Sequence, residues 1–408
     1  MKKLLIFALL LNAVLVGGRI FQELPVSAQG SGGTVVPEPC GVDPTKYSLD
    51  TNDDKSVDLS DAIYFLDWFF SGGEPPRVCL AQSAGCEHCL TDEQAEILGL
   101  MSIVERDDGQ GGLHKTILIS GANVQIVNGS GQTDSTNGTG NLIVGYQEQD
   151  PNGDNRTGSH NVVVGQLHDY SSYGGLVVGQ NNRISGTYAT VTGGHANVAS
   201  GDRASVSGGA LNVASGPNSS ITGGEGNKAR GKRSTVSGGR ENIAGGVNNT
   251  DPNIGYTSSI SGGLGNNTTG SDSSVSGGFA NQASGGQSSI SGGSTNSTTN
   301  DLCSVSGGIL NKAIGTGCSV SGGNQNIADG TTSSVSGGEQ CTAKAESASV
   351  SGGQGNQALG PFCSISGGQN NVVGVNPFVG KWCSVSGGLN RSAQGNHDWA
   401  AGSQFEDL

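Results

Sequence analysis

A fifteen-residue repeat occupies the chain from about residue 191 to residue 395. The unit approximates Ser-Ser-Val-Ser-Gly-Gly-x-x-Asn-x-Ala-x-Gly, and its apolar residue is numbered here as position 0. Two steps are longer: 24 residues lead to Ile260 and 20 lead to Val385. Fifteen residues cannot enclose a core alone, so each unit must bury its apolar residue against neighbouring units, which predicts a solenoid. Position 0 is occupied by Val191, Val206, Ile221, Val236, Ile260, Val275, Ile290, Val305, Val320, Val335, Val350, Ile365 and Val385.

The order of residues within one unit predicts which side chains point inward. Side chains alternate along a strand, so positions −2, 0 and +2 face one side and the serines at −1 and +1 face the other. A second short strand carries Asn at +6 and Ala at +8. We expect a thin core of Val or Ile and Ala, with stacked asparagines that form a hydrogen-bonded ladder. The ladder residues are Asn197, Asn212, Asn227, Asn242, Asn266, Asn281, Asn296, Asn311, Asn326, Asn356 and Asn371.

The composition supports an ordered β-solenoid. The chain has 72 glycines in 408 residues, and their period of fifteen differs from the period of three in collagen. The formal net charge of −14 argues against nucleic acid or an anionic membrane as the partner. The predicted fold class is an all-β solenoid, a parallel β-roll with coils of about fifteen residues, preceded by a small helical module.

The N-terminus has the pattern of a secretory signal peptide over residues 1–28. Lys2 and Lys3 precede an apolar run from Leu4 to Val16, and Val26-Ser27-Ala28 fits a cleavage site. The run is short for a membrane span, and no later segment approaches twenty apolar residues. We therefore expect a mature protein that is secreted or at the cell surface, without a membrane span, in a compartment that permits disulfides.

Several segments flank the regular repeat. Residues 29–39 form a linker, residues 40–89 a cysteine-containing module, and residues 90–112 a helix and connector. Residues 113–190 are expected to form an N-terminal β cap with irregular coils, residues 191–395 the regular roll, and residues 396–408 a C-terminal cap.

The helix before the solenoid is expected to run from Thr91 to Glu105. Thr91 and Gln94 form a capping box, and Leu90, Ile97 and Val104 recur every seven residues. This spacing leaves two alternatives: the helix seeds a short helical trimer, or it packs on its own domain.

The nine cysteines form two groups. Those before the solenoid (Cys40, Cys79, Cys86 and Cys89) fit either two disulfides, which export favours, or a zinc site. Within the solenoid, Cys303, Cys318, Cys363 and Cys383 share position −2, and Cys341 stands elsewhere in its unit. Neighbouring coils lie about 4.8 Å apart, near disulfide reach. The alternative is that these cysteines are simply small inward side chains.

Residues 50–61 fit a twelve-residue calcium loop. Oxygen ligands alternate along it as a hard cation requires, and Ala62–Phe70 follows as an amphipathic helix. Lys55 stands where such loops usually have Gly. The alternative is a solvated acidic loop. The pattern resembles one dockerin calcium loop, which implies a Ca²⁺ cofactor and a cohesin-like partner. The predicted ligands are Asp50, Asn52, Asp54, the Ser56 backbone, Asp58 and Asp61.

Over residues 141–395 the repeat resembles the Ser-Val-Ala-Ile-Gly-x-x-x-x-Ala-x-Gly head repeat of trimeric autotransporter adhesins, the YadA-like head. The resemblance implies a left-handed parallel β-roll that assembles as a homotrimer and binds extracellular matrix, glycan or other surfaces. The period here is mostly fifteen rather than fourteen, and Gly stands where the family has Ile. No coiled-coil stalk follows the repeats, so self-anchoring is not expected.

The sequence does not favour an enzyme. Its six histidines are scattered, no Gly-x-Ser-x-Gly elbow has a supporting triad, and the glycine-rich stretches do not precede helices as phosphate cradles do. Three functions remain open. The first is an adhesin-like structural and binding protein. The second is a dockerin-bearing component of a polysaccharide-processing or scaffold assembly. The third is a roll that binds ice or crystalline glycan.

Overall fold

The computed structural model describes residues 92–150, 153–246, 255–374 and 380–401. The predicted signal peptide, linker, cysteine module and calcium loop, and most of the predicted C-terminal cap, lie outside these residues. The chain divides into two compact units, Met1–Gln125 and Ile126–Leu408.

The described part of the first unit contains one helix and one β-hairpin. Helix α4 spans Asp92–Gly99, and strands β1 (Met101–Asp107) and β2 (Leu113–Ile119) pair antiparallel. The helix expected to reach Glu105 therefore ends six residues earlier, and that prediction was wrong for its C-terminal part. Val104 lies on β1, so it shares no helical stripe with Ile97. β-branched residues favour the extended backbone, and the glycine-rich segment before Leu113 provides a turn that pairs β1 with β2.

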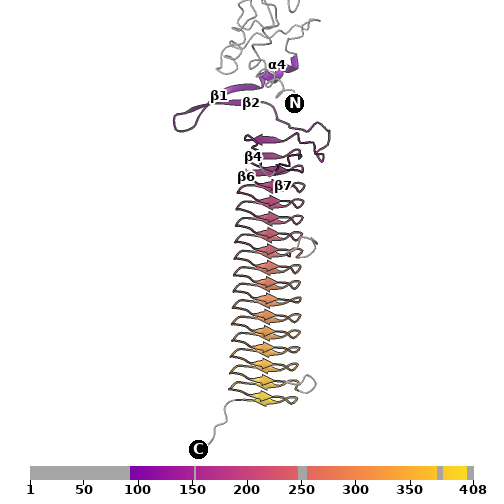
Figure 1. The fold of residues 1–408 in the computed structure, drawn as a ribbon, viewed down its shortest axis with the longest axis vertical. Coiled ribbons are helices and arrows are strands. Elements are labelled where there is room, and N and C mark those ends of the chain that lie inside the picture. Colours follow the sequence, from indigo (N-terminus) through magenta and orange to yellow (C-terminus); the bar gives the residue numbers. More distant parts are fainter. Residues whose placement is uncertain (1–91, 151–152, 247–254, 375–379, 402–408) are drawn as a thin grey trace, which may run out of the picture. The chain divides into compact units, whose positions relative to one another are not determined.

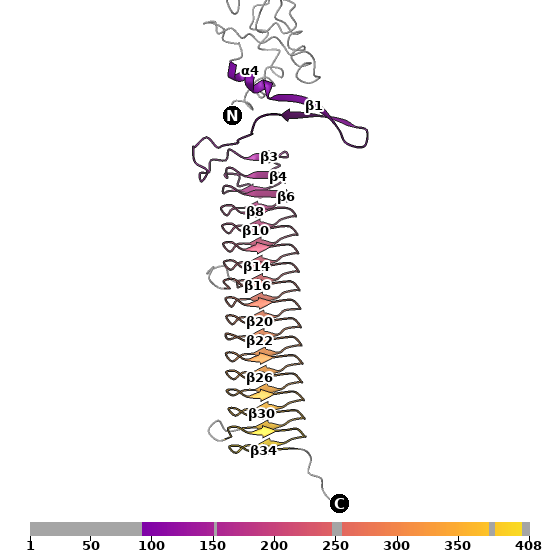
Figure 2. The ribbon, with the colours of Figure 1, turned by 180° about the vertical axis from the view of Figure 1, so that it is seen from behind.

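The second unit is a parallel β-solenoid whose coils stack one above another (Figures 1 and 2). The strands of one face pair with the corresponding strands of the coils before and after, in register. In chain order they are β3 (Leu142–Val144), β4 (Val162–Gln166), β6 (Leu176–Gln180), β8 (Thr190–Val191), β10 (Ser205–Val206), β12 (Ser220–Ile221), β14 (Thr235–Val236), β16 (Ser259–Ile260), β18 (Ser274–Val275), β20 (Ser289–Ile290), β22 (Ser304–Val305), β24 (Ser319–Val320), β26 (Ser334–Val335), β28 (Ser349–Val350), β30 (Ser364–Ile365), β32 (Ser384–Val385) and β34 (Trp399–Ala400).

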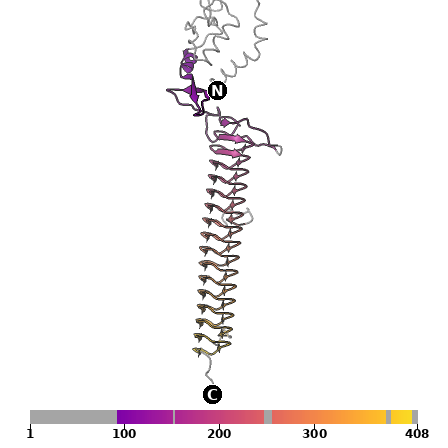
Figure 3. The same ribbon diagram turned by 90° about the vertical axis from the view of Figure 1, so that its left-hand side faces the viewer.

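Figure 3 shows both faces of the stack from the side. The opposite face is a 15-stranded parallel sheet. Its strands are β5 (Asp169–Tyr170), β7 (Arg183–Ile184), β9 (Val198–Ala199), β11 (Val213–Ala214), β13 (Lys228–Ala229), β15 (Ile243–Ala244), β17 (Asn267–Thr268), β19 (Gln282–Ala283), β21 (Ser297–Thr298), β23 (Lys312–Ala313), β25 (Ile327–Ala328), β27 (Thr342–Ala343), β29 (Gln357–Ala358), β31 (Val372–Val373) and β33 (Ser392–Ala393).

The core is one thin row of small side chains between the two sheets. In a representative coil, Val206 at position 0 and Ala214 at +8 are both fully buried, and Ala204 at −2 is buried beside them. The same columns are buried along the solenoid, with Thr268, Thr298 and Val373 in place of alanine at +8. The predicted core of Val or Ile and Ala is confirmed.

Stacked asparagines at +6 form the predicted ladder. The backbone N–H of Asn281 donates to Oδ1 of Asn266 at 3.0 Å. Its side-chain Nδ2 donates to the carbonyls of Gly277 in the same coil, at 2.9 Å, and Gly293 in the next coil, at 3.0 Å. The ladder asparagines are fully buried. Because each buried asparagine bonds to groups of its own coil and of both neighbouring coils, the column sets both the turn shape and the coil register.

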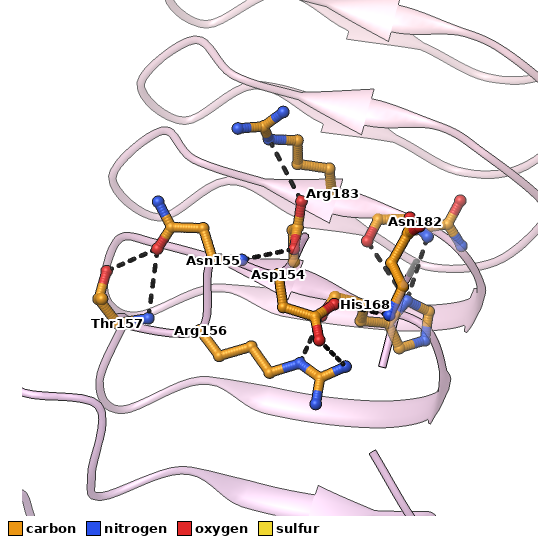
Figure 4. A network of polar contacts seen from close by, with 9 residues as sticks. Asp154, Asn155, Arg156, Thr157, His168, Asn182 and Arg183 are labelled. Atoms are coloured by element: carbon orange, nitrogen blue, oxygen red, sulfur yellow. Dashed lines mark hydrogen bonds and ion pairs between the residues drawn. The ribbon is translucent and has the colours of Figure 1, made fainter. Parts of the chain in front are cut away.

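Near the start of the ladder, His168 occupies the place that an asparagine holds in later coils (Figure 4). It is buried, its Nδ1 accepts the backbone N–H of Asn182 at 3.2 Å, and its Nε2 lies 3.0 Å from the Val164 carbonyl. Nδ1 also lies 3.3 Å from the Asn182 carbonyl, so both ring nitrogens contact backbone groups. His168 therefore has a structural role.

Besides the glycine at +3, each regular coil has two left-handed corners, at −3 and +5. Arg203 at −3 has φ 55° and Leu211 at +5 has φ 58°. Non-glycine residues adopt this conformation at a cost of about 1 kcal/mol or more. Their backbone N–H groups donate to the preceding coil, Arg203 to Thr187 at 2.7 Å and Leu211 to His195 at 3.1 Å, which offsets that cost. The side chains of both corners vary from coil to coil.

Replacing one ladder asparagine should destabilise the protein strongly. Asn281→Ala removes two donors and the acceptor for the backbone N–H of Asn296. We expect the free energy of unfolding to fall by about 3 kcal/mol or more, because each orphaned buried group costs roughly 1–3 kcal/mol. Chemical denaturation followed by circular dichroism measures this change.

The neighbouring exposed residue provides a matched control. Gln282→Ala truncates an exposed side chain and should change the free energy of unfolding by less than about 0.5 kcal/mol. Equal effects of the two substitutions would show that the ladder does not carry the stability assigned to it.

Candidate binding surfaces of the solenoid

Two rows of serine hydroxyls line the outer side of the sheet that contains β10 and β18. Position −1 is half-buried in most coils, as at Ser205 and Ser274, whereas position +1 is exposed, as at Ser207 and Ser276. Parallel in-register pairing repeats each row at the coil spacing of about 4.8 Å. The outward orientation predicted for these positions is confirmed, and the rows give the solenoid a long surface of small polar side chains.

The two glycines after the first strand of each coil have different roles. Gly278 at +3 has φ +91°, and a Cβ there would lie 2.2 Å from the carbonyl oxygen of Gly293, so this chain itself requires glycine. At +2 the backbone is outside the left-handed region and a Cβ would meet nothing within 4 Å. Glycines with both properties are Gly208, Gly223, Gly238, Gly262, Gly277, Gly292, Gly307, Gly322, Gly337, Gly352 and Gly367.

The open position +2 corrects the predicted alternation. The first strand ends at position 0, as β18 ends at Val275, so Gly277 lies beyond it and does not point into the core. At these eleven described positions neither the backbone φ nor a neighbouring atom requires glycine, whereas Gly387, also at +2, has φ +147°.

A basic corner, defined as Tyr188, Arg203, Lys232, Arg233 and Tyr256, lies on the −3 side of the coils. The Arg203 guanidinium carbon lies 6.0 Å from the Tyr188 ring centroid. The Lys232 ammonium and the Arg233 guanidinium lie 5.8 and 5.5 Å from the Tyr256 ring centroid. Cation–π contacts of this length hold the cations over the rings. The corner thus carries three cationic side chains on a chain whose formal net charge is −14.

An aromatic stack lies on the −3 side of the C-terminal coils. The rings of Phe362 and Trp382 lie 5.7 Å apart and those of Trp382 and His397 lie 5.0 Å apart, all nearly parallel. Phe362 and Trp382 remain 44% and 49% exposed. Sequence analysis missed this stack and the basic corner. The signal was present, since position −3 holds a variable residue in every coil, but nothing in the sequence marked it as an outward left-handed corner.

Ion pairs and hydrogen bonds connect polar residues of the first coils (Figure 4). These contacts use polar groups that a ligand would otherwise bind. Arg156 pairs with Asp154 at 3.2 Å, and the side chains of both are only 17% exposed. Arg156 also donates to the Gln147 carbonyl at 2.7 Å. Arg183 lies 3.8 Å from Asp169. The short, saturated contacts around Arg156 indicate a structural role.

The five solenoid cysteines are buried free thiols. Cys303 and Cys318 bring their sulfurs within 3.4 Å, and Cys363 Sγ lies 3.2 Å from the backbone N of Cys383. Burial, together with the neighbouring thiol, raises the pKa of Cys318, and the same causes raise the pKa of Cys383 to about 11. Burial raises the pKa of Cys341 as well.

The predicted calcium ligands (Asp50, Asn52, Asp54, Ser56, Asp58 and Asp61) lie outside the described residues. Within residues 92–150, 153–246, 255–374 and 380–401, no group of three or more His, Cys, Asp or Glu side chains is placed to hold a metal ion. The same residues contain no helix of the length and apolar character that a membrane crossing requires.

No protein-family model matches the chain, and no curated protein matches it.

Cys341 interrupts the asparagine ladder at +6. Its backbone N–H still donates to Asn326 Oδ1 at 2.9 Å, but its sulfur lies 3.5 Å from the Gly353 carbonyl, where an asparagine would donate through Nδ2. Cys341→Asn should restore the bonds that Asn326 makes one coil earlier, at 2.8 Å to Gly322 and Gly338.

The substitution Cys341→Asn is therefore expected to raise the free energy of unfolding by about 1–2 kcal/mol. Chemical denaturation measures it, with Cys341→Ser as the control that removes the thiol without supplying a carboxamide. A Cys341→Asn protein no more stable than Cys341→Ser would contradict the assigned role of the carboxamide.

Proposed function

We propose that this chain is a secreted or cell-surface, adhesin-like structural and binding protein that presents its β-roll as a homotrimer. The observation that carries the proposal is the glycine at +2, open in its own chain yet repeated along the solenoid. Glycine without a local need is expected where another backbone approaches closely. The exposed small serine at +1 beside it leaves room for the same approach.

The resemblance to YadA-like heads agrees with this reading and adds its finer features. These are the left-handed sense of the roll, the threefold assembly, and the binding of extracellular matrix or glycan. A uniform stack of coils suits that role, since it displays variable corner residues on a rigid rod.

Assembly can be tested with matched glycine variants. Sedimentation of the folded chain should give three chain masses. The triple variant Gly277→Gln, Gly292→Gln, Gly307→Gln fills positions with open space in the single chain, so it should keep its β-sheet dichroism and sediment as a monomer.

Gly278→Ala serves as the control, because it places a Cβ against the Gly293 carbonyl and should destabilise the coil itself. A folded wild-type monomer, or a trimer that the triple variant leaves intact, would overturn the assembly and the role of position +2.

The serine rows support a second candidate function. Hydroxyls repeated in register at about 4.8 Å match an ordered surface better than a single soluble molecule. A roll that binds ice or a crystalline glycan would use them. Adsorption to ice or crystalline glycan, without binding to soluble matrix proteins, would distinguish this function from adhesion.

We also propose that the loop at residues 50–61 binds one Ca²⁺, which supports a dockerin-like role with a cohesin-like partner as a further alternative. Calorimetric titration of the full chain should show one calcium site, because alternating carboxylates suit this cation. Asp54→Ala and Asp61→Ala should each abolish it. Glu346→Ala, a substitution in the solenoid, should leave it unchanged. Calcium binding retained in both loop variants would refute the assignment.

A further inference from the structure

Cys303 and Cys318 occupy the same position in consecutive coils. Each lies at −2, immediately before β22 and β24, which pair parallel and in register. Both side chains are 1% exposed, and their sulfurs are 3.4 Å apart. Paired strands lie about 4.8 Å apart, within the Cα separation of roughly 4.4–6.8 Å that a disulfide bridges. The two buried sulfurs are therefore in van der Waals contact across neighbouring coils.

The distribution of cysteine in this column favours pairing over simple filling. Position −2 holds alanine or serine in the other regular coils, and a lone cysteine would serve equally well as a small apolar filler. The four cysteines instead occur as two pairs in consecutive coils, Cys303 with Cys318 and Cys363 with Cys383. Filling alone gives no reason for this adjacency.

We propose that Cys303 and Cys318 form an inter-coil disulfide when the chain meets a disulfide oxidant, such as glutathione disulfide or an oxidoreductase disulfide. One thiolate attacks the oxidant, releasing one reduced thiol and leaving a mixed disulfide. The second thiolate then displaces the second reduced thiol. The chain loses two electrons and two protons. The oxidant takes up the electrons and the protons as its disulfide becomes two thiols.

The disulfide between the two coils would oppose local unfolding, to which a solenoid is prone. Each coil contacts only its neighbours, so opening spreads coil by coil from an end or from a local break. A covalent bond between the coils of Val305 and Val320 stops that spread in the middle of the C-terminal half.

Peptide mapping tests the proposal directly. The full chain is kept folded, or is denatured and refolded, in a glutathione redox buffer, then alkylated and cut with trypsin and an Asp-specific protease. Cleavage at Asp301, Lys312, Asp329 and Lys344 gives residues 301–312, 313–328 and 329–344, each with one cysteine. We expect residues 301–312 linked to residues 313–328 in at least one preparation, and Cys341 alkylated, since it lies in the asparagine column.

The stability of the oxidised protein provides a second measurement. Oxidation should raise the denaturation midpoint of the wild type, and removal of the disulfide with dithiothreitol should reverse the shift. The variant Cys303→Ser, Cys318→Ser has the serine found in neighbouring coils and should lose the part of the shift due to this pair. Recovery of both cysteines alkylated and unlinked in both preparations, or linkage of either one to Cys341, would overturn the proposal.

Discussion

The solenoid depends on the buried carboxamide at +6. Val or Ile at 0 and Ala at +8 bury little area per coil, so hydrophobic burial alone gives a weak preference for one register. Each ladder asparagine instead joins its own turn, the next turn and the next asparagine, as Asn281 does. A slip of one residue would leave the buried carboxamides and the backbone groups that they bond without partners. The ladder therefore explains why each coil stacks on the next in a single register.

The two long steps show where the coil tolerates change. Both insertions fall between the second strand of one coil and the first strand of the next, after Gly245 and after Gly374. The ladder continues across the first one, with the Asn266 N–H donating to Asn242 Oδ1 at 3.0 Å. β30 and β32 remain paired in register across the second. Length can vary at this corner because no ladder asparagine or core residue lies there.

Sequence periodicity was sufficient for the columns that one chain needs. Position 0, the asparagines, the alanines and the inward cysteines all follow from an alternating strand repeated every fifteen residues. Two expectations were wrong because local backbone geometry overrides periodicity. The strand is only two residues long, so Gly277 leaves the core face. The helix ends at Gly99 because Val104 pairs across a hairpin instead. Seven-residue spacing is a weak signal over two repeats, and β-branched residues before glycines favour strands.

The columns separate into those that the fold explains and those that it leaves unexplained. Glycine at +3, asparagine at +6 and the buried row at 0 are required by contacts within the chain. Glycine at +2 and serine at +1 are equally regular, yet in eleven of the described coils neither the backbone φ nor a neighbouring atom demands glycine at +2. A regular column without an internal cause points to a regular external contact, as a symmetric assembly or a lattice provides. The corner at −3 is the opposite case: it varies freely, and it places Arg203 over Tyr188 near one end and Trp382 against Phe362 near the other. Regular columns therefore suit assembly, and variable corners suit recognition of a ligand.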